Sequence, residues 1–287
     1  MNATFERFIA MSSQKLIFIT GVSSGFGRAL AQEALSAGHR VVGTVRTPEA
    51  KQSFETLDPA RAFGRLLDVT DVEAIGSIVA DVEAHIGPVD VLVNNAGYGH
   101  EGVMEESSLD AMRRQFDVNV FGPVAIMKAV LPFMRARRHG HILNITSMGG
   151  FITMPGIAYY CGSKFALEGI SEAVGKEVES FGIAVTAVAP GSFRTDWAGR
   201  SMVRATRAIS DYDALFDPIR QAREAKSGAQ LGDPVKAARA MLAAIDSNRP
   251  PAHLLLGSDA LTLVRNKLTA LAAELDTWEA VTRSTDG

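Results

Sequence analysis

Hydrophobic and polar residues follow two alternating periods along this chain. Short runs rich in apolar and β-branched residues are separated by longer stretches in which apolar residues recur at the spacing of an amphipathic helix. The runs predicted to be strands are "KLIFIT" (15–20), "HRVVGTV" (39–45), "FGRLLDV" (63–69), "VDVLVNN" (89–95), "GHILNIT" (140–146), "IAVTAVAP" (183–190) and "AHLLLG" (252–257). The alternation of strand and helix predicts repeated βαβ units.

Such units imply an α/β fold, because parallel strands need crossover helices that then cover both faces of the sheet. We expect a single-domain Rossmann fold: a doubly wound parallel sheet of about seven strands with helices on both faces. The longest predicted helices are Leu109–Arg137 and Ile157–Phe181. Residues 1–13 are expected to form a flexible tail, and residues 14–287 one domain with an insertion at about 192–232, where the rhythm breaks.

Composition narrows the functional classes. The 287 residues are 47% hydrophobic with a formal net charge of -3, which is typical of a globular chain and offers no basic surface for nucleic acid. Cys161 is the single cysteine, so an intrachain disulfide and a cysteine-rich zinc site are excluded, and no metal is expected. The apolar runs are shorter than the ~20 residues that cross a bilayer, and the first residues lack a signal peptide's apolar centre. We therefore expect a cytoplasmic protein without a membrane partner.

The first strand-to-helix turn, "TGVSSGFGRA", carries the first candidate chemistry. Gly21, Gly25 and Gly27 follow a predicted strand and precede a predicted helix. Glycines let the backbone of such a turn approach a pyrophosphate, which the free N–H groups and positive dipole end of the helix then hold. The spacing G-x-x-x-G-x-G differs from the dinucleotide fingerprint G-x-G-x-x-G, so a merely tight connection is the alternative.

The end of the second predicted strand indicates which dinucleotide would bind. An acidic residue there would bond the adenosine ribose of NAD(H), whereas a basic residue would bind the 2′-phosphate of NADP(H). "VVGTVRTP" places Arg46 there without an acid, because Glu49 lies past Pro48. Arg46, with the hydroxyl of Ser23 or Ser24, would form charge-assisted hydrogen bonds to a phosphate. NADP(H) is thus favoured over NAD(H), with a solvated strand-end arginine as the alternative.

The stretch "YYCGSKF" contains two adjacent tyrosines and a lysine. Tyr160 and Lys164 are four residues apart and share a helix face, while Tyr159 points about 100° away. A neighbouring ammonium would stabilise the phenolate and lower the tyrosine pKa from about 10, which would make Tyr160 a general acid or base. Tyr159 is expected to be a core or pocket-wall residue.

Several motifs taken together resemble the short-chain dehydrogenase/reductase superfamily over about Lys15 to Asp196. They are the glycine-rich turn, "NNAG" at Asn94–Gly97 after the fourth strand, Asn119, Ser147 after the fifth strand, Tyr160 with Lys164, and Pro190-Gly191 after the sixth. The stretches "TGVSSGFG" and "VVGTVRTPE" are most similar to the steroid and retinol dehydrogenase-like branch. The resemblance implies an NAD(P)-dependent oxidoreductase that moves a hydride between cofactor and substrate carbon.

The resemblance also implies roles for individual residues. In the catalytic tetrad, Ser147 would bond the substrate oxygen, Tyr160 would exchange its proton, Lys164 would lower the tyrosine pKa and bind the nicotinamide ribose, and Asn119 would hold a water. Beside Gly21, Gly25 and Gly27 at the pyrophosphate and Arg46 with Ser23 or Ser24 at the 2′-phosphate, Phe26 of the same turn is an expected cofactor contact. The resemblance adds Asp68 and Val69 at the adenine, Asn95, Ala96 and Gly97 at the adenosine ribose, and Pro190, Gly191 and Thr195 at the nicotinamide carboxamide. Asp68 could instead cap the helix that begins near Asp71.

The expected substrate class rests on apolar and aromatic residues that would line the pocket: Tyr98, Met148, Phe151, Met154, Phe193 and Trp197. They favour a hydrophobic ketone or aldehyde and its alcohol, although the same residues could pack in the core or at a subunit interface. The two longest helices carry more apolar surface than one sheet face covers, so a homodimer or homotetramer is expected. The alternative functions are a non-catalytic dinucleotide-binding redox sensor and a nucleotide-sugar epimerase or dehydratase.

Overall fold

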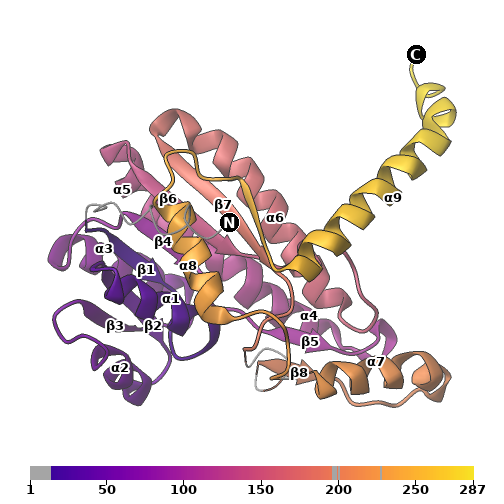
Figure 1. The fold of residues 1–287 in the computed structure, drawn as a ribbon, viewed down its shortest axis with the longest axis horizontal. Helices are drawn as coiled ribbons and strands as arrows, with labels where there is room; N and C mark the ends of the chain where they lie inside the picture. Colours follow the sequence, from indigo (N-terminus) through magenta and orange to yellow (C-terminus); the bar gives the residue numbers. More distant parts are fainter. Residues whose placement is uncertain (1–13, 196–198, 200, 227) are drawn as a thin grey trace, which may run out of the picture.

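Seven parallel strands form the central sheet of the computed structural model, which describes residues 14–195, 199, 201–226 and 228–287. Their spatial order is β3-β2-β1-β4-β6-β7-β9 (Figure 1). The strands are β1 (Leu16–Ile19), β2 (Arg40–Val45), β3 (Ala62–Leu66), β4 (Val91–Asn94), β6 (Gly140–Ile145), β7 (Ile183–Pro190) and β9 (His253–Leu256). Each coincides with a predicted strand, so the predicted single α/β domain with a doubly wound sheet is confirmed. The predicted tail, residues 1–13, lies outside the described residues.

Alternate residues of each strand face opposite layers of helices. In β1, Ile17 and Ile19 join a core with α1, α2 and α8, whereas Leu16 and Phe18 join a second core with α3, α5 and α6. The helices of the domain are α1 (Gly25–Ser36), α2 (Pro48–Glu55), α3 (Val72–His85), α4 (Leu109–Phe116), α5 (Gly122–Arg137), α6 (Ala158–Val178) and α8 (Pro234–Ile245). Both faces of the sheet are therefore buried, which explains the nearly continuous apolar runs of the central strands.

Four of these helices have an N-cap residue whose side chain accepts a hydrogen bond from a backbone N–H of the first turn. Thr47 caps α2 and Ser108 caps α4, with N–O distances of 3.2 and 3.1 Å. Asp71 caps α3 and Asp233 caps α8 in the same way. Helix α1 differs, because the side chain of its N-cap residue Ser24 makes no capping bond. Its first-turn N–H groups therefore stay open to a ligand.

The predicted helix Leu109–Arg137 is interrupted by one wider turn. Helix α4 passes into a π-helical turn, Asp117–Phe121, before α5 begins. The whole segment has the length and apolar content of a membrane-spanning helix. In this fold, however, α5 packs against α3, and its buried side chains, such as Ile126 and Val130, fill the second core. That packing accounts for part of its apolar character, while Leu109, Phe121 and Phe133 of the same segment are exposed.

The region 192–232, predicted to be irregular, contains regular structure of its own. Strand β8 (Met202–Arg204) pairs in parallel with β5 (Gly99–Glu101) in a small second sheet. Helix α7 (Asp213–Ala225) follows a 3-10 turn at Ser210–Tyr212. Neither short strand was predicted, because three-residue strands whose partners lie 103 residues apart leave little local signal.

Buried ion pairs fix this region to the rest of the domain. The buried carboxylate of Glu101 on β5 binds Arg204, with 2.8 Å between Oε2 and Nε, and also binds Arg223 of α7. Glu106, just before α4, accepts hydrogen bonds from the backbone N–H groups of Ala208 at 2.7 Å and Ile209 at 2.8 Å. These contacts hold β8 and α7 beside the segment that follows β4.

The last helix, α9 (Ser258–Arg283), projects from the body of the protein (Figure 1). Its buried residues, Ala260 and Val264, lie in its first two turns. The remaining short helical turns that we describe are Met104–Glu106, Met148–Gly150 and Glu179–Phe181.

Candidate active site

The residues selected from the sequence gather at one edge of the main sheet. Because the seven strands are parallel, their carboxyl ends lie together, and in such sheets ligands bind beyond those ends. Gly21 follows β1, Asn95 follows β4, and Ser147 follows β6. Pro190 ends β7 and leads into Gly191. Residues far apart in the sequence thus approach a single site.

The glycine-rich turn after β1 needs its glycines. Gly21 and Gly25 have φ angles of +72° and +59°, which other residues rarely adopt. A Cβ on Gly27 would lie 2.3 Å from the Gly21 carbonyl oxygen and 2.5 Å from the Asn95 amide nitrogen. That nitrogen donates hydrogen bonds to the carbonyls of Thr20 (2.8 Å) and Gly21 (3.0 Å), which ties the turn to the end of β4.

The start of α1 fits the pyrophosphate of a dinucleotide. Its first turn contains no acidic residue, so its N–H groups and dipole can face an anion without repulsion. Ser23 is exposed and Ser24 is half-buried at the same turn. Phe26 packs edge to face on Phe193, with 5.1 Å between ring centroids, and this contact supports the turn. Ala96 closes the other side, where its Cα would lie 3.2 Å from a Cβ on Gly21.

Arg46 and Asp68 lie at the carboxyl ends of adjacent strands. Arg46 is exposed directly after β2, and its charge is one cause of the lowered pKa of Asp68, after hydrogen bonds from Thr70. Asp68 Oδ1 accepts from the Thr70 N–H at 3.0 Å and from its hydroxyl at 2.8 Å. Asp68 is therefore not the cap of α3; Asp71 is. The next residue, Val69, is buried in the second core.

Tyr160 and Ser147 form the centre of the site. Tyr160 lies on α6, is 6% exposed, and shares a hydrogen bond with the Ser147 side chain. The Ser147 oxygen also accepts from the Gly149 N–H at 3.0 Å, which fixes its position at the end of β6. Burial raises the pKa of Tyr160 above its usual value, and the hydrogen bond to Ser147 opposes that rise.

Lys164 lies one helical turn after Tyr160, on the same face of α6. Its ammonium donates a 2.8 Å hydrogen bond to the Ile145 carbonyl and stands 5.7 Å from the centroid of the Tyr160 ring. Burial lowers the pKa of Lys164 to about 8, although the charge of Glu168 opposes this. The shared face was predicted correctly. Burial of the phenol dominates the Tyr160 pKa, which is raised overall, so the lowering by Lys164 that the sequence suggested stays a prediction.

Asn119 is placed by the π-helical turn, a feature that is frequent at functional sites. Its side chain binds both backbone groups of Tyr98, accepting from the N–H at 3.2 Å and donating to the carbonyl at 3.0 Å. It also donates to the Ser163 hydroxyl at 3.1 Å, and Ser163 in turn donates to the Tyr160 carbonyl. A Cβ on Gly97 would lie 3.1 Å from Asn119 Oδ1 and 3.7 Å from Lys164 Nζ. Gly97 therefore lies next to both groups, and a side chain at this position would crowd Asn119.

Tyr159 has a different environment. Its hydroxyl donates a 2.8 Å hydrogen bond to the Ser107 carbonyl, and its ring stacks on His100 at 5.4 Å. His100 is itself buried, and its Nε2 lies 2.9 Å from the Ser107 hydroxyl oxygen. Tyr159 therefore supports the β5 segment and stays away from Lys164.

A buried acid that the sequence analysis missed lies one turn beyond Lys164. Glu168 Oε1 is 2.5 Å from Thr146 Oγ1, and Oε2 is 3.0 Å from Nδ1 of His253 on β9. Burial raises the pKa of Glu168, and hydrogen bonds from Thr146 and His253 oppose this. The Thr146 hydroxyl also lies 2.9 Å from the Val188 carbonyl, so a protonated Glu168 that donates to Thr146 would satisfy all three groups. Its i,i+4 spacing from Lys164 is the signal that points to it.

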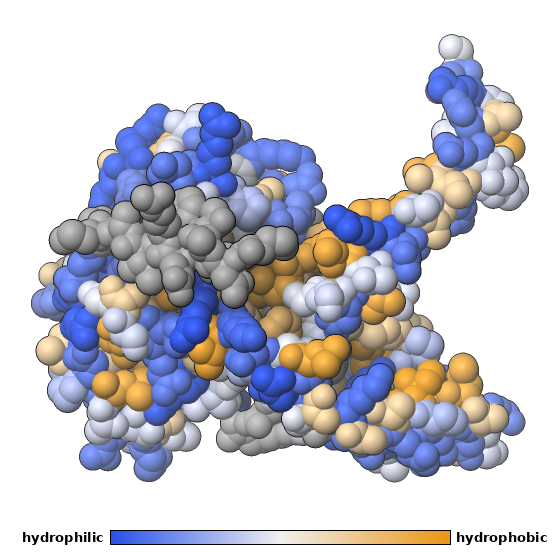
Figure 2. Space-filling view, in the orientation of Figure 1, coloured by the Kyte–Doolittle hydropathy of each residue, from blue (hydrophilic) through white to orange (hydrophobic). Residues whose placement is uncertain are grey.

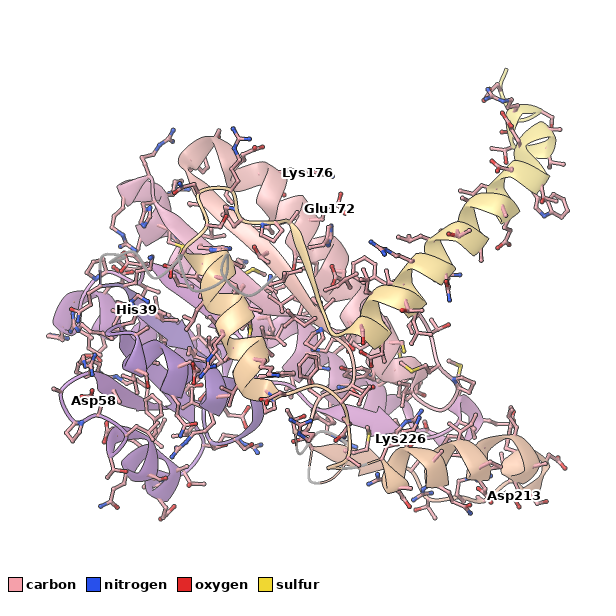
Figure 3. All side chains as sticks on the ribbon, viewed as in Figure 1. His39, Asp58, Glu172, Lys176, Asp213 and Lys226 are labelled. Carbon is pink, nitrogen blue, oxygen red and sulfur yellow. The ribbon has the colours of Figure 1, made fainter. Side chains whose placement is uncertain are left out.

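Beyond Glu168, helix α6 reaches solvent. Glu172 accepts a 2.6 Å hydrogen bond from Lys176, and both side chains lie on the outer part of the helix (Figure 3). His253 Nε2 is 3.9 Å from Glu172 Oε2. His253 thus stands between the buried Glu168 and the exposed Glu172.

The predicted pocket residues separate into two groups. Met154 packs against Tyr160, Tyr98 is tied to Asn119, and Met148 and Phe151 belong to the turn after Ser147. Phe151 also packs on His253 at 5.6 Å. Tyr98 and Met154 therefore lie beside members of the candidate tetrad, and Met148 follows Ser147 directly in the chain. Trp197 lies outside the described residues.

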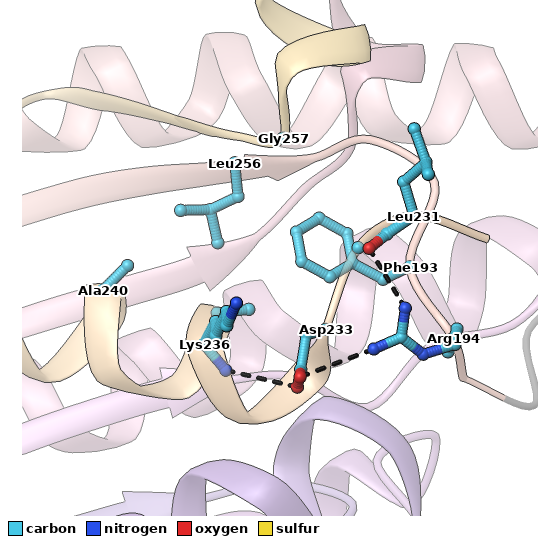
Figure 4. A pocket seen from close by; sticks show the side chains of 10 residues that line it. Phe193, Arg194, Leu231, Asp233, Lys236, Ala240, Leu256 and Gly257 are labelled. Carbon is cyan, nitrogen blue, oxygen red and sulfur yellow. Dashed lines mark hydrogen bonds and ion pairs between the residues drawn. The ribbon is translucent and has the colours of Figure 1, made fainter.

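Phe193 belongs to the first core instead. It lines a 470 Å³ pocket beside α8, together with Leu231, Leu256 and Ala240 (Figure 4). Arg194 borders this pocket and binds Asp233, with 3.4 Å between Nη2 and Oδ2. The nearby Thr195 side chain faces the glycine-rich turn, 3.9 Å from where a Cβ on Gly25 would stand.

Two further expectations concern Cys161 and metals. Cys161 is buried as a free thiol, and burial raises its pKa, which makes it a weak nucleophile. Within the described parts of the chain, no group of three or more histidine, cysteine or acidic residues is arranged to hold a metal ion.

Known proteins are similar to this chain in sequence and in fold. Residues 15–204 match the short chain dehydrogenase family. The oxidoreductase BOA17 of Botryotinia fuckeliana is 36% identical over 92% of this chain and 96% of that protein. The 3-ketodihydrosphingosine reductase of Bacteroides thetaiotaomicron is 40% identical over 70% of this chain and 73% of that protein. A solved short-chain dehydrogenase from Streptomyces avermitilis is 42% identical, with 96% of this chain and 99% of that chain covered and a TM-score of 0.90.

The site and the fold together define an oxidoreductase that uses a nicotinamide cofactor, since a turn suited to a dinucleotide stands beside a buried tyrosine and lysine. The matches to known proteins show which family of oxidoreductases this is. The chain belongs to the short-chain dehydrogenase family, and it is an NAD(P)-dependent oxidoreductase, as the motifs predicted.

Proposed function

We propose that this protein interconverts a hydrophobic ketone or aldehyde and its alcohol, prefers NADP(H), and uses Tyr160 as the general acid or base. The main support for the reaction is the buried hydrogen bond between Ser147 and Tyr160. It lies at the sheet edge that also carries the dinucleotide-binding turn. A hydroxyl pair in that position can bond one substrate oxygen.

The chemistry divides between cofactor and protein. The nicotinamide, when bound, supplies or accepts the hydride. In the direction of reduction, Ser147 and Tyr160 donate hydrogen bonds to the carbonyl oxygen, which stabilises its developing negative charge. Tyr160 then gives its proton to that oxygen, and the Lys164 ammonium over its ring stabilises the phenolate that remains. Because burial raises the pKa of Tyr160, the phenol carries the proton needed for reduction at neutral pH.

The preference for NADP(H) is supported by the end of β2. That strand ends at Val45 without a carboxylate that could bond a ribose, and Arg46 follows it. Arg46 is exposed and takes part in no ion pair among the described residues. Its guanidinium could therefore bond a 2′-phosphate bidentately. The neighbouring carboxylate of Asp68 is occupied by Thr70.

Cofactor kinetics test this preference. A charged hydrogen bond of about 1–3 kcal/mol would favour NADPH roughly ten- to a hundredfold over NADH. The Arg46→Ala variant should raise the KM for NADPH by a similar factor and leave that for NADH nearly unchanged, since NADH lacks the phosphate. The matched control is Arg113→Ala, which removes an exposed arginine of α4 and should change neither KM. Wild-type enzyme that uses NADH as well as NADPH would contradict the preference.

The substrate class is supported by the apolar side chain of Met154, which packs against the cluster that includes Tyr160, and by those of Met148 and Phe151 in the turn after Ser147. One relative is named for reduction of a keto compound, 3-ketodihydrosphingosine. NADPH oxidation should be measured over ketones and aldehydes of increasing apolar size. We expect kcat/KM to rise with apolar surface, and selectivity for small polar carbonyls would contradict this part of the proposal. We also propose a cytoplasmic location, which the buried free thiol of Cys161 suits.

The expected assembly stays a proposal as well. The helical segments α4–α5 and α6 expose large apolar side chains, including Leu109, Phe121, Phe133 and Phe165. Such surfaces are typical of protein interfaces. We expect a homodimer or homotetramer in light scattering, and a monomer at micromolar concentration would contradict that expectation.

A further inference from the structure

Helix α9 carries an apolar stripe that no described residue covers along most of its length. Leu268, Leu271, Leu275 and Trp278 are between 40% and 62% exposed. They continue a series whose spacing alternates between three and four residues, as in the seam of a coiled coil. We call this series the α9 seam: Leu261, Val264, Leu268, Leu271, Leu275 and Trp278. Figure 2 shows apolar side chains along the projecting helix.

Most of the length of α9 lies outside the packed body of the protein. Its 26 residues span about 39 Å, and every residue after Val264 is exposed. Helices in proteins gain most of their stability from packing an apolar face. The seam can gain that stability only from a surface outside the described chain.

The charges beside the seam identify that surface as a second copy of α9. Lys267 and Glu274 occupy the same heptad position, and Arg265 and Glu279 occupy the position on the other side of the seam. In an antiparallel pair in which Leu268 faces Leu271 of the second copy, Lys267 faces Glu274 of that copy. The same register sets Arg265 opposite Ala272 of the second copy, so the other side of the seam brings no like charges together. Two-fold symmetry repeats the Lys267–Glu274 pair.

Both apolar ends of the seam match in this register. Leu261 faces Trp278 of the second copy, and Leu275 reaches the base of the other helix at Val264. A parallel pair would instead bring Glu274 against Glu279 of the second copy, which is repulsive. The flanking charges therefore select the antiparallel arrangement.

A membrane surface fits this helix less well. Helices that lie on membranes have a polar face rich in lysine and arginine. The exposed part of α9 contains Arg265, Lys267 and Arg283, but it also contains Glu274, Asp276 and Glu279. Its distal half would meet an anionic lipid surface with acidic residues.

We propose that α9 is an assembly element that pairs with α9 of a second copy through an antiparallel seam. This contact is separate from any contact made by α4–α5 and α6. Each projecting helix lies along the other, so that the tip of one reaches the base of its partner.

Charge exchange at Lys267 and Glu274 tests the pairing. Both side chains are exposed, so Lys267→Glu and Glu274→Lys should leave the monomer folded, which circular dichroism can check. Each single variant opposes like charges twice and should halve the assembly mass in light scattering at equal micromolar concentration. The double variant, Lys267→Glu with Glu274→Lys, should restore the wild-type mass, and so should an equimolar mixture of the two single variants. Asn266→Glu, at the outermost heptad position of the helix, is the control and should keep that mass.

Three outcomes would overturn the proposal. The first is a wild-type mass that neither single variant lowers. The second is a double variant that stays dissociated. The third is a wild-type protein that sediments with phosphatidylcholine–phosphatidylglycerol vesicles and loses that binding in Leu271→Asp, because the seam would then bind lipid.

Discussion

Helices α6 and α9 are the longest described helices, with 21 and 26 residues, and they differ in what surrounds them. Helix α6 buries ionisable side chains, including Tyr160, Lys164 and Glu168, while its charged residues near the end face solvent. Helix α9 exposes leucines and a tryptophan. Buried ionisable groups have shifted pKa values and mark a site of chemistry, whereas an exposed apolar stripe marks a surface for association. Both helices are amphipathic, so their surroundings decide which role applies.

The largest difference between the helices should appear in catalysis. Tyr160→Phe removes the hydroxyl that we propose exchanges the proton, and it should lower kcat by roughly 10²- to 10⁴-fold. Stopped-flow fluorescence of bound NADPH should show cofactor affinity near the wild-type value. The adjacent Tyr159→Phe should keep kcat, because that hydroxyl binds Ser107. Greater damage from the Tyr159 change would refute the assignment.

Leucines on the two helices should differ strongly in their contribution to stability. Leu167 on α6 is 1% exposed, and its change to alanine should lower the free energy of unfolding by about 2–5 kcal/mol. Leu275 on α9 is 62% exposed, and Leu275→Ala should change it by less than about 0.5 kcal/mol in dilute protein. Urea unfolding curves measure both. Equal losses would mean that α9 folds back onto the body of its own chain.

The buried Glu168 of α6 should make the stability of the protein depend on pH. Because burial raises the folded-state pKa of Glu168, the folded state keeps a proton that the unfolded state has released. Its contribution to stability is therefore fully present below the unfolded pKa and is lost as pH rises through the folded pKa. The stability of Glu168→Gln relative to wild type should rise across that window, which urea unfolding at a series of pH values measures. A variant whose stability runs parallel to wild type across the window would show that the pKa of Glu168 is not raised.

The smallest expected effect concerns the hydrogen bond of Tyr159. Tyr159→Phe leaves the Ser107 carbonyl without its donor, which should cost about 1 kcal/mol in the free energy of unfolding. Exposed polar changes on α9, such as Thr277→Val, should cost less, because water replaces the lost bond. Thermal unfolding resolves this difference, and a Tyr159→Phe protein as stable as wild type would show that the bond contributes nothing.

Local pattern was sufficient to predict the main sheet and the centre of the site. Apolar runs of strand length and the helical spacing between them correspond to β1 through β9, apart from the two short strands β5 and β8. The four-residue spacing of Tyr160 and Lys164 placed them on one face of a helix, and the glycines after β1 marked the turn that fits a dinucleotide. These features depend on a few neighbouring residues, so a short stretch of sequence contains the information.

Other features depend on partners that are distant in the sequence. Glu168 meets His253, 85 residues away, and Glu101 meets Arg223 across the insertion, so no local spacing reveals either contact. From the sequence, Phe193 could line a substrate pocket or pack in the core. Its packing with α8 and Phe26 places it in the core.

The sequence by itself determined the βαβ order, the dinucleotide-binding turn and the identity of the paired tyrosine, because these follow from backbone periodicity and local conformation. Only the tertiary structure decided the protonation tendencies of Tyr160, Lys164 and Glu168 and the exposure of the α9 seam. The physical reason is that desolvation and burial are set by all the atoms around a side chain, and the folded chain brings those atoms from every part of the sequence.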